Sequence, residues 1–246
     1  MTLSGKAALV TGGARRIGRG VAMALASAGA DTAITYLTSQ SQAAETARAI
    51  ESLGGSQVRG ALALHCDVRS ETSVRAAIAA TVDRFGRLDI LVNNAAVFAS
   101  SGLDAFTLAE WDKVFETNAR GPFLVAREAL PHLRRSRGRI VNIGSLGGLR
   151  AWPGHAGYCA SKAALHSLTQ SMARAFAPAV SVNCVAPGWI ECGDEPEETA
   201  AHFAAKTPMQ RNGAVDDVAR AVLFFATGPA FITGQILAVD GGLGLV

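Results

Sequence analysis

The sequence predicts an α/β fold: a single, doubly wound parallel sheet of about seven strands, with helices on both faces. Short apolar runs recur along the chain, and segments with helical periodicity alternate with them. A glycine-rich turn also joins the first predicted strand to the first helix. This alternation favours parallel strands, because consecutive parallel strands need a crossover that is usually a helix. The predicted strands are residues 6–10, 33–36, 61–65, 90–92, 139–143, 180–186 and 236–239.

Apolar periodicity identifies the helices between these strands. Apolar residues recur there at spacings of three and four, which places them on one face of a helix that can pack on the sheet. The predicted helical segments are residues 21–26, 42–53, 111–133, 158–176 and 216–227.

Length and composition place these elements in one domain that covers residues 1–246. Of the 246 residues, 49% are hydrophobic and 17% are charged, so the chain can bury a large core. No internal repeat, low-complexity tract or linker divides it. The segment at about 189–207 is polar, acidic and interrupted by Gly193 and Pro196, and we expect it to be an irregular, mobile lid over the substrate. An ordinary surface excursion is the alternative.

Charge and cysteine patterns argue against several classes of function. The net charge is +3, and the basic residues are scattered apart from a cluster at 134–139, which fits a solvated helix end better than a nucleic-acid surface. The four cysteines form no Cys-x-x-Cys pair and lie at no metal-ligand spacing from a histidine, so we expect reduced thiols and no metal site. No run approaches about 18 apolar residues, and the N-terminus lacks a cleavable signal. We therefore expect a cytoplasmic protein that binds neither nucleic acid nor membranes.

The glycine-rich turn predicts a dinucleotide site. It reads Thr11, Gly12, Gly13, Ala14, Arg15, Arg16, Ile17, Gly18. Glycines let the backbone approach a pyrophosphate, which also meets the positive end of the dipole of the following helix. Arg15 and Arg16 oppose that dipole, which suggests a bound anion, although two solvent-exposed arginines are the alternative.

The residues that close the second predicted strand favour NADPH over NADH. In a dinucleotide fold this position meets the adenine ribose, where Asp or Glu selects NAD and basic or hydroxyl side chains admit a 2′-phosphate. Here the strand end carries Tyr36, Thr38 and Ser39, and no acid occurs before Glu45. Arg15 can add a charge-assisted contact to the phosphate.

A tyrosine and a lysine four residues apart supply the candidate proton chemistry. Tyr158 and Lys162 share one face of a predicted helix, and Ser145 follows the strand at 139–143. A free tyrosine has a pKa of about 10, which a cation about 4 Å away would lower by about three units at an effective dielectric of about 20. Ser145 could hydrogen-bond the oxygen that Tyr158 protonates. A purely structural Tyr–Lys pair is the alternative, because this spacing is common on helices.

Further motifs follow the other predicted strands. Asp67 and Val68 come after the third strand, the run Asn-Asn-Ala-Ala at 93–96 after the fourth, and Pro187 with Gly188 after the sixth. Asp67 could equally cap the next helix, and paired Asn side chains commonly hold turns. Ligands of open α/β sheets bind beyond the carboxyl ends of the strands, which is where these motifs are expected to converge.

Together these motifs resemble the short-chain dehydrogenase/reductase family over essentially the whole chain. The turn at 11–18 is similar to the family's Thr-Gly-x-x-x-Gly-x-Gly turn, with Arg16 in place of the second glycine. The run 93–96 is similar to its Asn-Asn-Ala-Gly turn, with Ala96 in place of the glycine. The resemblance further implies that Asp67 and Val68 meet the adenine, and that Pro187 and Gly188 lie beside the nicotinamide.

The resemblance implies a role for each candidate residue. Tyr158 would be the general acid, Lys162 would lower its pKa and bind the nicotinamide ribose, and Ser145 would orient the carbonyl and stabilise its developing charge. Asn118 would anchor a proton relay by holding a water behind Lys162; the alternative is a helix kink held by backbone bonding. The expected cofactor-binding residues are Gly12, Arg15, Arg16, Ile17, Gly18, Tyr36, Thr38, Ser39, Asp67, Val68, Asn94, Ala95, Ala96, Tyr158, Lys162, Pro187 and Gly188.

The predicted function is NADPH-dependent reduction of a carbonyl or a pterin-type C=N bond. Arg16 and the stretch 150–154 resemble the pteridine reductase branch, which generally carries Asp where this chain has Ser145. Ser145 instead suits ketone reduction, as in 3-oxoacyl-acyl-carrier-protein reductases. Two less favoured functions are NAD-dependent alcohol oxidation and non-catalytic regulation by a protein that senses the dinucleotide.

The helices at 111–133 and 163–176 carry wider apolar faces than one core needs. By resemblance to the family, these helices pair between subunits. We therefore expect a homotetramer.

Overall fold

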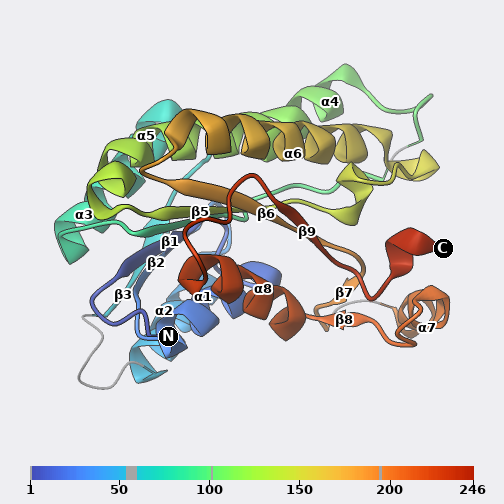
Figure 1. The fold of residues 1–246 in the computed structure, drawn as a ribbon. Coiled ribbons are helices and arrows are strands. Elements are labelled where there is room, and N and C mark those ends of the chain that lie inside the picture. Colours follow the sequence, from blue (N-terminus) through green and yellow to red (C-terminus); the bar gives the residue numbers. More distant parts are fainter. Residues whose placement is uncertain (1, 54–59, 101, 194–195) are drawn as a thin grey trace.

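A seven-stranded parallel sheet forms the centre of the computed structural model, which describes residues 2–53, 60–100, 102–193 and 196–246 (Figure 1). The strands are β1 (Ala7–Val10), β2 (Asp31–Tyr36), β3 (Ala61–His65), β4 (Ile90–Asn93), β5 (Arg139–Ile143), β6 (Ser181–Pro187) and β9 (Ile236–Val239). Their order is β3-β2-β1-β4-β5-β6-β9, and each neighbouring pair is parallel. The predicted doubly wound parallel sheet is confirmed.

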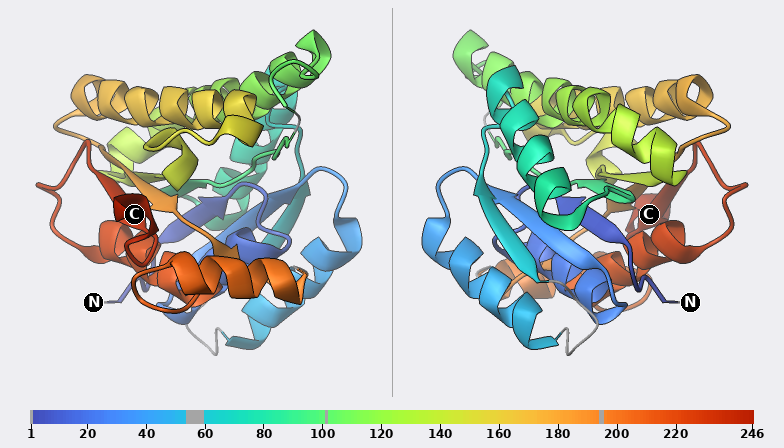
Figure 2. Two further views of the ribbon diagram at one scale, coloured as in Figure 1. Left: turned by 90° about the vertical axis from the view of Figure 1, so that its right-hand side faces the viewer. Right: turned by 90° about the vertical axis from the view of Figure 1, so that its left-hand side faces the viewer.

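Helices cover both faces of the sheet, as the alternating pattern predicted (Figures 1 and 2). One face carries α1 (Arg16–Ser27), α2 (Gln40–Leu53) and α8 (Val215–Thr227). The other face carries α3 (Glu71–Phe85), α5 (Gly121–Ser136) and α6 (Ala156–Phe176), and α4 (Leu108–Phe115) packs against α6.

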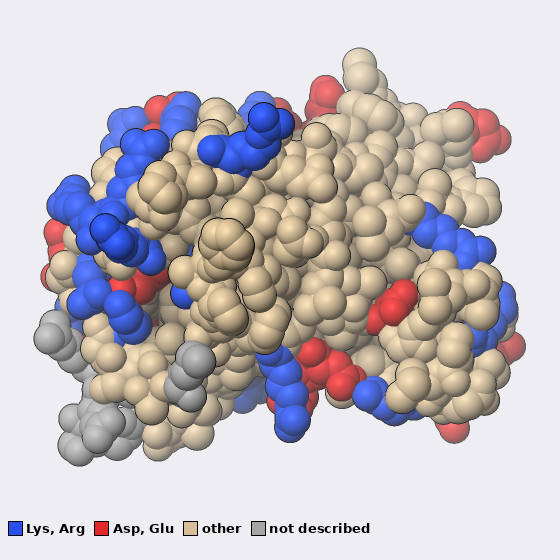
Figure 3. Space-filling view, in the orientation of Figure 1, with Lys and Arg blue, Asp and Glu red and all other residues tan. Residues whose placement is uncertain are grey.

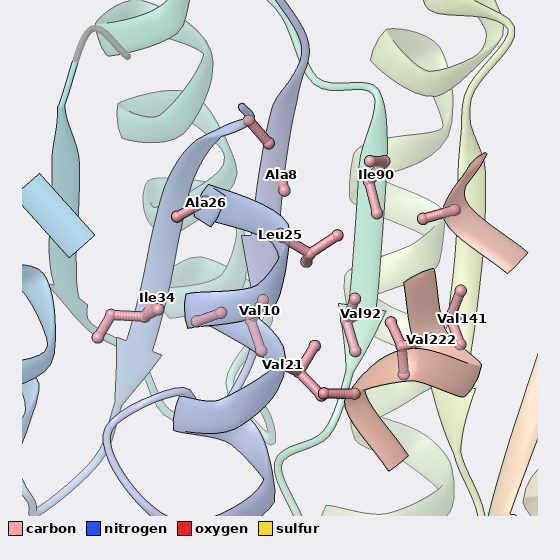
Figure 4. Close-up of a cluster of buried hydrophobic side chains, with 14 of the residues drawn as sticks. Ala8, Val10, Val21, Leu25, Ala26, Ile34, Ile90, Val92, Val141 and Val222 are labelled. Carbon is pink, nitrogen blue, oxygen red and sulfur yellow. The ribbon is translucent and has the colours of Figure 1, made fainter. Parts of the chain in front are cut away.

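Each strand supplies side chains to two separate cores, because successive residues of a strand point to opposite faces. In β1, Ala8 and Val10 join the core beneath α1 and α8, whereas Ala7 and Leu9 join the core beneath α3, α5 and α6. Figure 4 shows the first of these cores, where α1 and α8 pack on β1, β4 and β5. Burial on both faces explains why the strands read as nearly continuous apolar runs.

The segment at about 189–207 is more regular than the sequence predicted. It contains β7 (Ile190–Glu191) and α7 (Glu197–Lys206), and β7 pairs with β8 (Gly213–Ala214) in a second, two-stranded sheet. Trp189 stacks on Phe203 of α7, with ring centroids 4.1 Å apart and planes 8° from parallel. Residues 194 and 195 of the predicted lid lie outside the described part of the chain, and its role as a lid stays a prediction.

Charged side chains are unevenly distributed over the surface. In the orientation of Figure 3, Lys and Arg gather over the left end and uncharged side chains cover most of the centre. Arg134 and Arg135 lie in the last turn of α5, which agrees with the predicted helix end. Among the described residues, no helix is both long and apolar enough to span a membrane.

Candidate active site

The motifs that follow β1 and β4 are joined at the carboxyl edge of the sheet. Asn94 donates from Nδ2 to the carbonyl oxygens of Thr11 and Gly12, at 2.9 Å each. Thr11 Oγ1 in turn accepts the backbone N–H groups of Asn94 and Ala95, at 3.0 and 3.1 Å. The paired Asn motif therefore has the turn-holding role that was one of its two expected roles, and it fixes the glycine turn against β4.

Two glycines allow the turn after β1 to pack closely against its neighbours. Gly12 has a φ of +63°, in the left-handed region that glycine adopts without strain. A Cβ at Gly18 would lie 2.2 Å from the carbonyl oxygen of Gly12, so only glycine fits there. The first turn of α1 has no acidic residue, and its N-cap residue, Arg15, makes no side-chain capping hydrogen bond. These backbone N–H groups form the kind of site that binds a pyrophosphate.

Arg16 adopts a strained backbone conformation in this turn. Its φ is +51°, whereas an L-residue in the left-handed region costs about 1–2 kcal/mol. This is the position at which the family motif has its second glycine, so the structure explains the preference for glycine. The side chains of Arg15 and Arg16 are both exposed at the start of α1.

The end of β2 lies directly beside the glycine turn. Gly12 N–H donates to Thr35 Oγ1 at 3.2 Å, and Gly13 N–H donates to the Thr35 carbonyl at 3.0 Å. Thr38 is exposed and Ser39 half-buried just beyond the strand. The contacts of Thr35 place the end of β2 beside the turn that carries Arg15, and the predicted phosphate-binding hydroxyls follow this strand end in the chain. Tyr36 packs edge-on against His65, with centroids 5.7 Å apart.

Asp67 is not the cap of the following helix. Ser70 is the N-cap of α3 and accepts the N–H of Ser73, so the capping alternative is wrong. The Asp67 carboxylate instead pairs with Arg69 at 2.8 Å. That hydrogen bond is the main reason why the pKa of Asp67 lies below its ordinary value. Val68 beside it is buried.

Asn118 lies in a π-helical turn, Glu116–Arg120, between α4 and α5. Its Oδ1 accepts the N–H of Val97 at 2.9 Å, and its Nδ2 donates to the Val97 carbonyl at 2.9 Å and to Ser161 Oγ at 3.1 Å. Ser161 Oγ donates onward to the carbonyl of Tyr158 at 2.7 Å. The helix is locally π-helical here, but the side chain bonds the backbone of Val97 and not that of its own helix, and so links the loop after β4 to the helix that carries Tyr158.

Lys162 is buried in α6 beneath the end of β5. Its Nζ donates to the carbonyl of Ile143 at 2.8 Å and lies 5.8 Å from the centroid of the Tyr158 ring. Burial lowers the pKa of Lys162 to about 8, and Cys184 acts weakly in the opposite direction. The Lys162 amine is therefore charged at neutral pH, but its pKa is more than two pH units below that of an ordinary lysine.

Ser145 is placed to bind the hydroxyl of Tyr158. Ser145 Oγ accepts the N–H of Gly147 at 3.1 Å, which leaves its own O–H to donate to Tyr158. Burial raises the pKa of Tyr158 above its ordinary value, and the hydrogen bond from Ser145 opposes part of this rise. The sequence predicted a lowered pKa instead. The reason for the difference is desolvation: the fold that brings Lys162 to the tyrosine also removes water from the phenol, which penalises the phenolate.

The turn after β6 also lies at this edge. Gly188 N–H donates to the carbonyl of Val239 in β9 at 3.0 Å, and a Cβ at Gly188 would lie 2.8 Å from the Asp240 side chain. Pro187 pairs with Val239 as the last residue of β6. Gly188 is therefore needed for close packing between β6 and β9.

Aromatic side chains that sequence reasoning missed surround Tyr158. The Phe98 ring contacts Tyr158 edge-on and His155 at a tilt, each with centroids 4.9 Å apart. Phe98 is 61% exposed, and Trp152 extends the group, 6.1 Å from His155. Phe98 could have been found from the sequence, because it lies only four residues beyond Asn94, in a loop at the carboxyl edge of the sheet. These rings form an apolar wall at the mouth of the site.

Within the described residues, no group of three His, Cys, Asp or Glu side chains is arranged to hold a metal ion. The four cysteines are free thiols, three of them buried.

Known proteins share this architecture. A family model described as Enoyl-(Acyl carrier protein) reductase matches residues 12–244. A 3-oxoacyl-[acyl-carrier-protein] reductase (FabG) of Staphylococcus aureus is 37% identical over 244 residues, covering 97% of this chain and 98% of that protein. A short-chain dehydrogenase/reductase from Serratia marcescens superimposes with a TM-score of 0.92 at 37% identity, over 99% of this chain and all of that one. The chain belongs to the short-chain dehydrogenase/reductase family. It is therefore an oxidoreductase, and the resemblance drawn from its motifs is confirmed.

Two further relatives bear on the cofactor and the substrate of this short-chain dehydrogenase/reductase. A blue fluorescent protein from a metagenomic library, in complex with NADPH, superimposes with a TM-score of 0.90 at 35% identity, and each chain covers 99% of the other. A 3-oxoacyl-[acyl-carrier-protein] reductase of Synechocystis is 36% identical over 98% of both chains. The pterin alternative gains no support from these relatives.

Proposed function

We propose that this short-chain dehydrogenase/reductase uses NADPH to reduce a carbonyl group, with Tyr158 as the proton donor. The observation that carries the proposal is the group formed by Ser145, Tyr158 and Lys162 at the carboxyl edge of the sheet, beside the glycine turn. A donor hydroxyl, a phenol and a buried cation at the place where such folds bind dinucleotides are the parts that carbonyl reduction needs.

The residues of the glycine turn fit a bound dinucleotide. Gly12 and Gly18 let the turn pack tightly against Asn94 and Ala95, and the first turn of α1 offers uncapped N–H groups to a pyrophosphate. Arg15, Thr38 and Ser39 would hold a 2′-phosphate, since the loop 37–39 carries no carboxylate to repel it. When bound, the dinucleotide supplies hydride chemistry, and the protein supplies position and protons.

The raised pKa of Tyr158 suits the direction of reduction. A general acid must be protonated before the reaction, and burial keeps the phenol protonated at neutral pH. As negative charge develops on the substrate oxygen, Ser145 would donate a hydrogen bond to it and the charge of Lys162 would stabilise the tyrosinate that remains. The contribution of one such oxyanion donor is about 3 kcal/mol.

Asn118 would support the proton path from behind. Both N–H groups of its amide are engaged, by Val97 and by Ser161, so the side chain chiefly fixes the loop after β4 against α6. If Asn118 holds a water behind Lys162, its side chain is already occupied, so its backbone carbonyl would accept the hydrogen bond from that water.

A 3-oxoacyl thioester is the substrate class that we favour. Ser145 suits ketone reduction, and two relatives are named 3-oxoacyl-[acyl-carrier-protein] reductases. The apolar wall of Phe98, His155 and Trp152 would accommodate an acyl chain more readily than a polar pterin ring.

A substrate panel tests this proposal. Purified protein is given NADPH or NADH with 3-oxoacyl thioesters, simple ketones and pterins, and nucleotide oxidation is followed. We expect turnover of oxoacyl thioesters with NADPH. Faster turnover of pterins would shift the substrate class, tighter binding of NADH would favour alcohol oxidation, and nucleotide binding without turnover of any substrate would favour a regulator.

We also propose that the chain forms a homotetramer. Leu108, Trp111 and Phe123 of α4 and α5 are exposed, as are Phe224 of α8 and Leu237 of the edge strand β9. The mostly uncharged face in Figure 3 is the one along which β9 lies. Apolar patches of this kind mark interfaces between subunits. The mass in solution tests the assembly, and cell fractionation tests the predicted cytoplasmic location.

A further inference from the structure

The imidazole of His166 lies under the turn that carries Ser145. His166 is four residues after Lys162 in α6 and is 4% exposed. Its Nε2 accepts the backbone N–H of Ser145 through a long hydrogen bond of 3.5 Å. A single ring therefore connects α6 to the backbone of the Ser145 turn, residues 144–148.

Two glycines of the Ser145 turn make space for this ring. A Cβ at Gly144 would lie 2.3 Å from His166 Nε2, and a Cβ at Gly148 would lie 2.6 Å from His166 Cε1. Both distances are too short for a residue with a Cβ, which at Gly144 would also meet Cys184 Sγ at 2.7 Å and at Gly148 the backbone of Lys162 at 2.8 Å. The Ser145 turn thus lies against the Nε2–Cε1 edge of the ring, with Ser145 between the two glycines in the sequence.

His166 is a neutral acceptor over the whole physiological range. Burial, and next the charge of Lys162, lower its pKa to about 4, while an interaction with the Gly148 backbone acts in the opposite direction. Because Nε2 accepts from Ser145, the single proton of the neutral ring is on Nδ1. The ring can then hold the Ser145 turn without adding a second positive charge beside Lys162.

We propose that His166 is a positioning residue, which fixes the Ser145 turn against α6 so that Ser145 Oγ faces the hydroxyl of Tyr158. Ser145 comes from β5, whereas Tyr158 and Lys162 come from α6, so the geometry between them depends on how these two elements are joined. Lys162 joins them at Ile143 and Thr169 joins them at Asn142, whereas His166 joins them at Ser145 itself. A catalytic group displaced by about 1 Å can lose about 100-fold in rate, so the connection at Ser145 has a kinetic consequence.

The proposal rests on the proposed function, and two substitutions at one position test it. His166→Leu replaces the imidazole by an apolar side chain of similar bulk and so removes the Nε2 acceptor. His166→Gln instead provides a side-chain oxygen that can accept the Ser145 N–H. Ser167→Ala, an exposed neighbour on α6, is the matched control. Steady-state kinetics, NADPH affinity and the midpoint of unfolding are measured for all four proteins.

We expect His166→Leu to lower kcat by about tenfold with NADPH affinity unchanged, and His166→Gln to recover most of the loss. Ser167→Ala should behave like the unaltered protein. Equal losses in the leucine and glutamine variants would show that the ring only fills space and would overturn the proposal. Unchanged kcat in both variants would overturn it as well.

A measurement on the unaltered protein keeps the proposal testable if the variants do not fold or no substrate is found. The ¹⁵N shifts of His166 report which ring nitrogen carries the proton. We expect the Nδ1–H form at neutral pH with no titration until about pH 4. An Nε2–H form would contradict the bond from Ser145, whether or not the protein is an NADPH-dependent reductase.

Discussion

The glycine turn after β1 and the Ser145 turn after β5 lie at the same edge of one sheet but are built in opposite ways. The glycine turn has exposed cations, Arg15 and Arg16, and one of them is in a strained conformation. The Ser145 turn is largely buried and packs against the ring of His166, and Lys162, whose charge acts on that ring, is 3% exposed.

The two turns differ in how well their charged groups are solvated before a ligand binds. Exposed arginines keep their solvation until an anionic ligand arrives, so they bind without a large cost to the folded protein. Lys162 is buried and Tyr158 is half-buried, so partial loss of water has shifted their pKa values before any ligand is present. Substitutions in the Ser145 region should therefore change rate and stability strongly, and those in the glycine turn should change binding mildly.

The largest effect is expected for Tyr158→Phe. The ring and its contact with Phe98 remain, but the proton donor is lost. Loss of a general acid costs about 10²–10⁴-fold, so kcat should fall by that factor while the NADPH dissociation constant stays nearly the same. Rate measurements and fluorescence titration check the two halves of this prediction, and a variant that kept normal turnover would assign the proton to another group.

Lys162→Met should abolish activity and stabilise the fold. The pKa of Lys162 is 10.5 in the unfolded chain and about 8 when folded, so burial penalises the charged amine by about 3 kcal/mol at neutral pH, where both states carry the proton. The substitution also removes the bond to Ile143, worth about 1 kcal/mol, which leaves a net gain of about 2 kcal/mol at pH 7.

The buried Lys162 also predicts how stability and activity change with pH. The stability of the unaltered protein should rise as the pH increases from about 8 towards 10.5, because the cost of burying charged Lys162 disappears. Its activity should fall as the pH rises through about 8, because the cation is lost. Urea unfolding at both ends of this window tests the first statement, with the exposed Lys113→Met as control. A destabilised Lys162→Met at pH 7 would contradict the account.

Arg15→Ala should weaken NADPH binding by about tenfold and leave NADH binding unchanged, because only the 2′-phosphate needs the charge-assisted contact. Isothermal titration with both nucleotides measures this difference. Arg19→Ala, an exposed cation one turn further along α1, is the control for a general loss of positive charge. Equal weakening of both nucleotides would place Arg15 elsewhere on the cofactor.

The smallest effect is expected for Arg16→Gly. It relieves a φ of +51° and should raise the free energy of unfolding by about 1 kcal/mol, less the extra freedom of glycine in the unfolded chain. Arg137, at the end of α5, has the same φ of +51°, so Arg137→Gly should give an equal gain. Only Arg16→Gly should also change nucleotide affinity, and an identical affinity in both variants would remove Arg16 from the binding site.

The sheet and the strand-end motifs were predictable because they depend on short-range pattern. Parallel strands buried on both faces read as apolar runs, and their carboxyl ends meet at one edge whatever the loops do. The same reasoning placed Ser145 beside Tyr158. It missed the two-stranded sheet of β7 and β8, because two-residue strands carry no periodicity.

The direction of the Tyr158 pKa shift was not predictable from spacing. The i, i+4 pattern indicates that Lys162 is near, but desolvation depends on everything packed around the phenol, including Phe98 from the loop after β4. The role of Asp67 was similarly open, because pairing with Arg69 and capping by Ser70 both depend on the path of one short loop.

Titration of Tyr158 is the most direct test of the central claim, that burial keeps this phenol protonated at the edge of a dinucleotide site. The chain has only two tyrosines, so the difference in tyrosinate absorbance between the unaltered protein and Tyr158→Phe reports Tyr158 alone. We predict a pKa above the ordinary value of about 10 in the free protein, and a lower pKa when NADP+ brings positive charge to the site. An ordinary or lowered pKa in the free protein, unchanged by NADP+, would contradict the account.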